Sequence, residues 1–285
     1  MDHDEVLALF DRQLRREAVP DGPGARVERV GRVVRQVAPE HGWNGVVWSG
    51  LDGRTADAAV ADQIRHFTAL RREFEWKLYG YDQPADLADR LRRAGFVAEP
   101  TETLMVAEIS ELPLDAALPD GVEVRPVTDA AGADLLARVQ EEAFGTDASA
   151  LRQRLLDQLA GQPETVSAVV ASADGVPVCA ARMELYPGTA FAGLWGGGTV
   201  PAWRGRGIYR ALVAHRARTA AARGYRYLQV DASDMSRPIL RRLGFVALTT
   251  TTPYQYLPGR PQDTDRPVPT AGGAAGPPPA SGGEG

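Results

Sequence analysis

A short glycine-rich stretch offers the clearest chemistry in this 285-residue chain. Arg204-Gly205-Arg206-Gly207 follows a strand-like segment, Phe191–Thr199, and precedes a helical pattern that begins near Ile208 and stops at Gly224. The first N–H groups of a helix have no partner within the helix and lie at the positive end of its dipole, so they attract phosphates. Two glycines let the backbone curl around an anion, and two arginines add charge-assisted donors at the rim. The stretch therefore predicts a phosphate-binding loop.

Other phosphate-binding motifs do not fit this stretch. A Walker loop requires Gly-Lys-Ser/Thr, and a dinucleotide loop requires a third glycine three residues further on, where Arg210 stands. An ordinary tight turn stays open as the alternative, because the chain is rich in arginine: Lys77 is the only lysine among 32 basic residues.

Together with its surroundings, the loop resembles the signature of the GNAT superfamily of acyl-CoA-dependent N-acyltransferases. That signature, Arg/Gln-x-x-Gly-x-Gly/Ala, follows the fourth strand of the family's sheet, and here it runs from Arg204 to Tyr209, after Val200. Tyr209 departs from the pattern, because glycine or alanine is usual at that position. The resemblance covers residues 121–257 and includes a second block, a strand, a short helix and Gly244-Phe245.

The resemblance implies an α/β fold in which a twisted mixed sheet, flanked by helices, splays open between its fourth and fifth strands. It implies acetyl-CoA as cosubstrate in that split, with pantetheine paired to the backbone near residues 195–200, and it implies no metal. The cosubstrate-binding residues that it implies are Thr199, Val200, Arg204, Gly205, Arg206, Gly207, Ile208, Tyr209 and Asp234. A glycine run, residues 196–198, weakens a strand, and we expect pantetheine or acceptor to pass close to its backbone.

The family's usual proton-transfer groups are absent. Many relatives place a glutamate on the fourth strand as base and a tyrosine four residues before the Gly-Phe glycine as acid; here Phe191–Thr199 carries no carboxylate and the second position holds Leu240. The catalytic residues therefore stay unknown, with Glu184 as a candidate base and Tyr209 as a displaced hydroxyl. Glu184 could instead be a solvated strand residue and Tyr209 a packing residue, and positioning alone can carry much of the barrier.

An internal repeat predicts two related halves. Residues 92–96, Arg-Arg-Ala-Gly-Phe, reappear as Arg-Arg-Leu-Gly-Phe at 241–245, an offset of 244 − 95 = 149, and the same register without gaps places Asp82 on Asp231. In the first half, residues 50–56 carry Asp52 and no glycine pair at the expected helix start. We therefore expect tandem GNAT-like halves: a degenerate domain without a phosphate loop at 1–112, an acetyltransferase domain at 118–257, and a disordered Pro/Gly tail at 258–285.

Composition narrows the remaining classes. The net charge of −5 argues against bulk binding of nucleic acid, no apolar run approaches the roughly 18 residues of a membrane helix, and the acidic N-terminus is unlike a signal peptide. A single cysteine, Cys179, excludes an intrachain disulfide. We expect a cytoplasmic protein with neither nucleic acid nor membrane as partner; the oligomeric state is not readable.

The resulting functional hypothesis is an N-acetyltransferase. It moves an acetyl group from acetyl-CoA to a primary amine, on a small molecule or a peptide, by direct attack in a ternary complex. The alternative is a non-catalytic module that binds or senses acyl-CoA, which the loss of both usual proton-transfer groups favours and the retained phosphate loop opposes.

Overall fold

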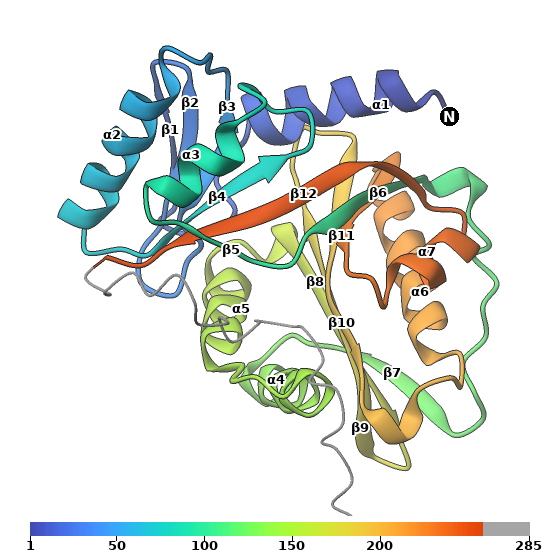
Figure 1. Ribbon diagram of the computed structural model, residues 1–285. Coiled ribbons are helices and arrows are strands. Elements are labelled where there is room, and N and C mark those ends of the chain that lie inside the picture. Colours follow the sequence, from blue (N-terminus) through green and yellow to red (C-terminus); the bar gives the residue numbers. More distant parts are fainter. Residues whose placement is uncertain (259–285) are drawn as a thin grey trace, which may run out of the picture.

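The computed structural model describes residues 1–258, which form a mixed α/β fold around one sheet of twelve strands with helices on both faces (Figure 1). The expected tail lies, from residue 259 onward, outside the described residues. The N-terminal half comprises α1 (His3–Phe10), a π-helical turn (Asp11–Arg16), β1 (Arg26–Val30), β2 (Val33–Val37), β3 (Gly45–Ser49), α2 (Ala56–Ala69), β4 (Phe74–Tyr79), α3 (Leu87–Arg93), β5 (Val97–Ala98) and β6 (Glu102–Glu108).

The C-terminal half repeats much of this order. It comprises β7 (Val122–Pro126), α4 (Ala130–Phe144), α5 (Ser149–Gly161), β8 (Val166–Ala173), β9 (Val176–Leu185), β10 (Phe191–Thr199), α6 (Ile208–Ala222), β11 (Tyr227–Ala232), α7 (Arg237–Arg242) and β12 (Val246–Tyr256). The helices α4 and α5 lie on one side of strands β8–β10, and α6 and α7 lie on the other (Figure 1).

The two halves exchange their last strands. The sheet order is β1-β2-β3-β4-β12-β6-β11-β10-β9-β8-β7, so β12 of the C-terminal half pairs with β4, and β6 of the N-terminal half pairs with β11. Each exchanged strand also contributes side chains to the hydrophobic core of the other half. Met105 of β6 packs in the core under β9–β11, and Tyr254 of β12 packs in the core around Phe74. Neither half completes its sheet or its core without a strand of the other.

The structure confirms the repeat and corrects its register. In each half a parallel strand pair flanks one long helix, β3 and β4 around α2, and β10 and β11 around α6. Gly95 and Gly244 end the equivalent helices with left-handed φ of 96° and 102°. The helices α3 and α7 end 242 − 93 = 149 residues apart, but β4 and β11 end 232 − 79 = 153 apart, because the connection before α3 is longer. Asp82 therefore follows its strand, Asp231 lies within one, and the two do not correspond.

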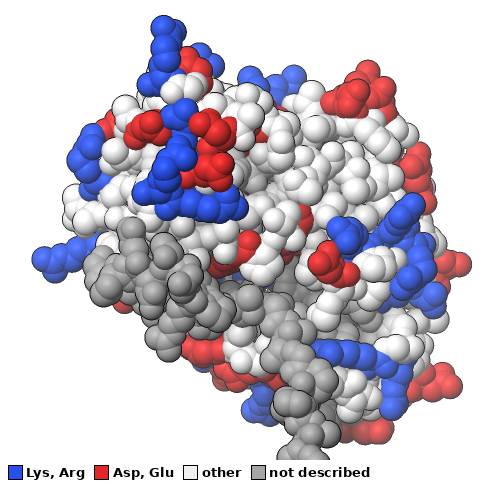
Figure 2. Space-filling view, viewed as in Figure 1, with Lys and Arg blue, Asp and Glu red and all other residues white. Residues whose placement is uncertain are grey.

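Surface charge and helix hydrophobicity bear on possible membrane and polyanion partners. Basic and acidic side chains are interspersed over the face shown in Figure 2, and no helix among residues 1–258 is long and apolar enough to cross a membrane. One arginine of α6 is an exception to the surface placement of charged residues: Arg216 is only 1% exposed.

The strand exchange predicts that residues 118–257 cannot fold alone, because β11 and β12 would each expose an edge that β6 covers. We expect the isolated fragment to aggregate or to unfold without a cooperative transition, and co-expression with residues 1–117 to restore a soluble complex. Circular dichroism melts and size-exclusion chromatography measure this. A monomeric fragment that unfolds cooperatively at the temperature of the intact chain would contradict it.

Candidate functional site

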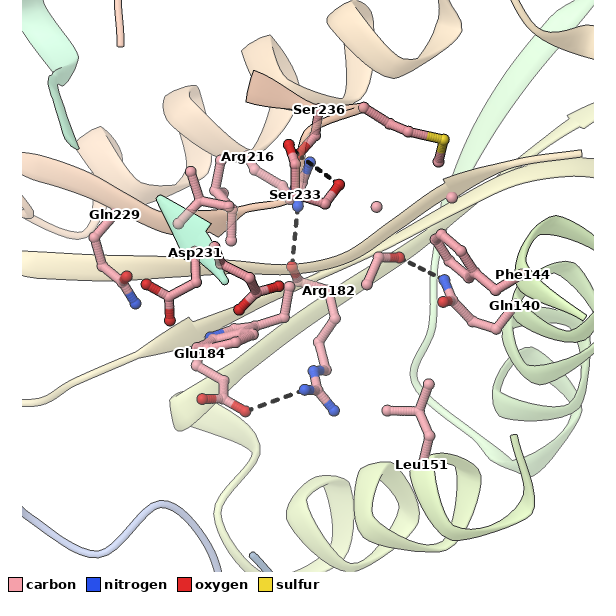
Figure 3. A pocket seen from close by; sticks show the side chains of 18 of the residues that line it. Gln140, Phe144, Leu151, Arg182, Glu184, Arg216, Gln229, Asp231, Ser233 and Ser236 are labelled. Atoms are coloured by element: carbon pink, nitrogen blue, oxygen red, sulfur yellow. Dashed lines mark hydrogen bonds and ion pairs between the residues drawn. The ribbon is translucent and has the colours of Figure 1, made fainter. Parts of the chain in front are cut away.

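The parallel strands β10 and β11 separate soon after they meet. They pair only from Phe191 opposite Tyr227 to Gly193 opposite Gln229, and beyond that point the sheet is split. A cavity of about 1650 Å³ opens there, and residues of both halves line it. Figure 3 labels some of the lining side chains of the C-terminal half. The split leaves the edge of β10 that faces β11 without a strand partner after Gly193, so its N–H and C=O groups need other partners. Side chains supply two of them: Gln140 donates to the Gly196 carbonyl and Arg204 to the Thr199 carbonyl.

The phosphate-loop geometry appears at the mouth of this split. Gly205 and Gly207 have left-handed φ of 76° and 84°, which only glycine adopts at low cost. The hydrogen bonds of α6 begin with the N–H of Ala211, which donates to the Gly207 carbonyl at 3.0 Å. A Cβ at Gly205 would meet nothing within 4 Å, and both glycines line the cavity. The loop presents the free N–H groups of a helix start to an anion-sized space.

The arginine side chains of the loop contact the protein itself. Arg204 Nε donates to the Thr199 carbonyl at 3.1 Å, and its Nη2 donates to the Ala143 carbonyl at 2.8 Å. It thereby ties β10 to α4. Arg206 stacks over Trp203, with 4.3 Å between its Cζ and the ring centroid. Arg210 was not among the residues predicted to bind the cosubstrate, but its Nη2 lies 4.0 Å from the position that a Gly207 Cβ would take.

The other residues that the resemblance implied for cosubstrate binding lie either in the hydrophobic core or at the rim of the cavity. Val200 and Ile208 pack into the core under β8 and β9, so only their backbone can face a ligand. Thr199 Oγ1 lies 3.1 Å from the buried Cys179 thiol, whose pKa burial raises. Asp234 lines the cavity rim with its side chain 84% exposed and paired to Arg237 at 2.9 Å.

The glycine run of β10 has a packing explanation. A Cβ on Gly197 would lie 2.7 Å from the Tyr209 ring, and one on Gly198 would lie 2.7 Å from the Phe144 ring. These rings press on opposite faces of the strand, from α6 and α4. The expected close approach over the glycines is therefore made by the protein's own aromatic side chains, and the strand bulges between Trp195 and Gly198.

The two candidate catalytic residues lie in the cavity lining but apart from each other. Glu184 is 5% exposed and engaged: its Oε1 accepts from Arg154 at 3.1 Å and pairs with Arg182 at 3.4 Å, and its Oε2 accepts from the Tyr186 hydroxyl. The Tyr209 ring lies against the α6 face of β10, and burial raises the pKa of its hydroxyl. The Glu184 carboxylate is thus bound by two arginines and a tyrosine hydroxyl.

A row of carboxylates that sequence reasoning missed crosses the floor of the cavity. The registers place Glu75 and Lys77 of β4, Glu102 of β6 and Asp231 of β11 on one face of the sheet. Lys77 Nζ pairs with Asp231 and lies 5.3 Å from the Trp195 ring centroid. Burial, and then the charge of Asp231, raises the pKa of Glu102 to about 7. Only the strand exchange brings these residues of the N-terminal half beside Asp231.

In the N-terminal half, side chains of the protein itself occupy the helix start and the strand split that correspond to the glycine loop and the β10–β11 split. Asp52 Oδ1 accepts from the N–H groups of Arg54 and Thr55, both at 2.9 Å, so a carboxylate occupies the start of α2. Hydrogen bonding from Thr55 lowers the pKa of Asp52. Arg15 fills the split between β3 and β4: its Nε donates to the Val47 carbonyl at 2.9 Å, and its Nη2 binds both oxygens of Asp82.

Comparisons with known proteins agree with this geometry. Residues 133–245 match the model of the Acetyltransferase (GNAT) family. A GCN5-related N-acetyltransferase from Kribbella flavida is 21% identical with a TM-score of 0.64, over 92% of this chain and 96% of that one. A GCN5-related N-acetyltransferase from Sphaerobacter thermophilus is 16% identical with a TM-score of 0.58, over 89% and 84%.

A third solved structure shares the tandem arrangement. It is a tandem GNAT protein from the clavulanic acid biosynthesis pathway, 15% identical with a TM-score of 0.55, over 85% of this chain and 86% of that one. No curated protein matches the sequence. At these identities the solved structures show the fold, and the fold is that of two GNAT-like halves.

Gly193, where the split begins, supplies a test of the site's packing. A Cβ there would lie 2.7 Å from Gln229 Nε2, Trp195 Nε1 and the Tyr186 hydroxyl. We expect Gly193→Ala to lower the free energy of unfolding by about 1–3 kcal/mol, because three hydrogen-bonding groups must move. Urea denaturation measures the change. Gly53→Ala is the control, since its Cβ would make only a 3.7 Å contact with Arg90; equal stability of both variants would contradict the packing described.

Proposed function

Because the C-terminal half of the chain carries a domain of the GNAT acetyltransferase family at residues 133–245, we propose that the protein transfers an acetyl group from acetyl-CoA to a primary amine. The observation that carries this proposal is the glycine loop at the mouth of the β10–β11 split, which leads into a cavity whose lining includes the carboxylate row. The loop suits the phosphates of a long thioester, the strand edge suits its amides, and the carboxylate row suits a cationic acceptor.

The residues present fit the cosubstrate. The N–H groups at the start of α6, between Gly205 and Arg210, would hold the pyrophosphate, and Arg206 and Arg210 would add charge at its rim. The free edge of β10 after Gly193 would pair with the pantetheine amides. Bound there, acetyl-CoA supplies an activated acetyl group close to Trp195 and the carboxylate row.

Glu102 is the group best placed to accept the amine's proton. Its carboxyl lines the cavity and has no hydrogen bond or ion pair with another side chain among residues 1–258, unlike Glu184. The neutral amine attacks the thioester carbonyl, the C–N bond forms, and the C–S bond breaks. The amine's proton goes to the Glu102 carboxylate, and the departing thiolate takes a proton from water. A pKa near 7 suits a base at neutral pH.

The alternative function, binding or sensing of acyl-CoA without turnover, is supported by Leu240, which is fully buried where relatives carry a tyrosine hydroxyl. Thiol release from acetyl-CoA against a panel of amines separates the two functions. Binding of acetyl-CoA with no thiol release for any amine would favour the sensor.

Replacing Gly207 tests the phosphate loop. We expect Gly207→Glu to abolish acetyl-CoA binding, because a side chain and a negative charge enter the anion site together. Gly224→Glu is the matched control: it has nearly the same φ, 83°, open space around it, and lies past the other end of α6. Isothermal titration calorimetry should give one acetyl-CoA per chain for the wild type and the control. Two sites per chain, or unchanged affinity of folded Gly207→Glu, would overturn the assignment.

The pKa of Glu102 predicts a pH dependence. As the pH falls below about 7 the carboxylate becomes protonated and cannot accept a proton, so kcat of the wild type should fall. Glu102→Gln should be slower on the order of a hundredfold and should lack this fall. Glu108→Gln, on the same strand but outside the cavity lining, is the control. An unchanged pH profile in Glu102→Gln would mean that another group accepts the proton.

A further inference from the structure

The carboxylate row contains more carboxyl groups than are required to bind and deprotonate a single amine. Glu75, Glu99, Glu102 and Asp231 all line the cavity, and the basic side chain among them is Lys77. Lys77 pairs with Asp231, and among residues 1–258 no ion pair reaches Glu75, Glu99 or Glu102. Buried like charges without counter-ions are costly, and a cationic ligand would offset them.

One oxygen of this row is left without a partner. The Asp231 side chain is 2% exposed, its Oδ2 binds Lys77, and its Oδ1 is buried with no hydrogen-bond donor in the described structure. Figure 3 shows Asp231 among the side chains that line the cavity, on the strand next to β10. A buried, unpaired carboxylate oxygen on a cavity wall is a position that a ligand's N–H group would satisfy.

The far end of the row forms a second group of acceptors. Glu75 Oε2 accepts from Trp43 Nε1 at 3.1 Å and from Gln255 Nε2 at 3.3 Å, and Glu99 lies close enough for the two charges to interact. Burial raises the pKa of both carboxyls, and the Glu75 charge adds to the effect on Glu99. Glu75 lies on β4, two strands beyond Glu102 on β6, which is about 10 Å measured perpendicular to the strands. The registers also set it four residues further along the strands, because Glu75 pairs with Gln255 and Glu102 with Thr251.

From this arrangement we propose that the acceptor is an amine with a second ammonium group on the same chain. Asp231 and Glu102 face the reacting amine, and Glu75 and Glu99 bind the distant ammonium, with the Trp43 indole beside them. The inference rests on the proposed function and narrows it to linear diamines and longer polyamines. In this proposal the N-terminal half selects the acceptor amine, and the C-terminal half binds acetyl-CoA.

The test compares cadaverine with pentylamine and aminopentanol, which share its chain length but have one ammonium group. We expect the wild type to have a kcat/KM for cadaverine at least about tenfold above that for either monoamine, the effect of one charge-assisted contact. In the double variant Glu75→Gln, Glu99→Gln this ratio should fall about tenfold. The control is Glu73→Gln, an exposed residue outside the cavity lining, which should keep the ratio.

Calorimetry with cadaverine alone separates failure of this inference from failure of the proposed function. Binding of cadaverine to the wild type and its loss in the double variant support the carboxylate subsite, even if no amine is acetylated. Equal kcat/KM for cadaverine and pentylamine, or an unchanged ratio in the folded double variant, would overturn it.

Discussion

The backbone hydrogen bonds that join β6 to β11 and β12 to β4 are the interactions on which the rest of this structure depends. They convert two half-sheets into one and fix which residues face the cavity, because the pairing register decides the face of every side chain. Through β6 and β4 the N-terminal half places Glu102, Glu75 and Lys77 on the floor of a cavity whose phosphate loop belongs to the other half. A slip of one residue in either pairing would turn these carboxylates to the opposite face.

The same architecture is used twice with opposite results. Both halves have a parallel strand pair that separates around a long helix, and both separations create unpaired backbone groups that must be satisfied. In the N-terminal half, Arg15 and Asp52 satisfy them from within the protein. In the C-terminal half, the corresponding split opens into the cavity instead. The two halves thus differ in whether one of the protein's own side chains fills the split between the parallel strands.

The sequence predicted the local features well and the long-range ones poorly. The bounds of β10 and α6 and the glycine loop follow from strand and helix signals within some thirty residues, and the family resemblance placed them in a fold. The strand exchange joins residues more than a hundred positions apart, so no local pattern signals it, and the carboxylate row depends on it. The side-chain contacts of Arg204 and Arg216 could not be predicted for a related reason. Arg204 donates to the carbonyls of Thr199 and Ala143, and Arg216 to those of Leu212 and Arg182, and each pair of carbonyls includes one that is distant in the sequence.

The placement of the chain's single lysine has a consequence for self-modification. A protein that holds an activated acyl group close to its own side-chain amines risks acylating itself. Desolvation works against the charge of Lys77, but the Asp231 carboxylate outweighs it and keeps the pKa of Lys77 well above its usual value. The Lys77 ammonium therefore has no lone pair with which to attack a thioester, although it lies within the carboxylate row. The remaining basic side chains that carry the protein's positive charge are arginines, whose guanidinium groups stay protonated and are not nucleophiles. Apart from the N-terminal amine, the acyl thioester that we propose as cosubstrate would therefore meet no deprotonated amine on this chain.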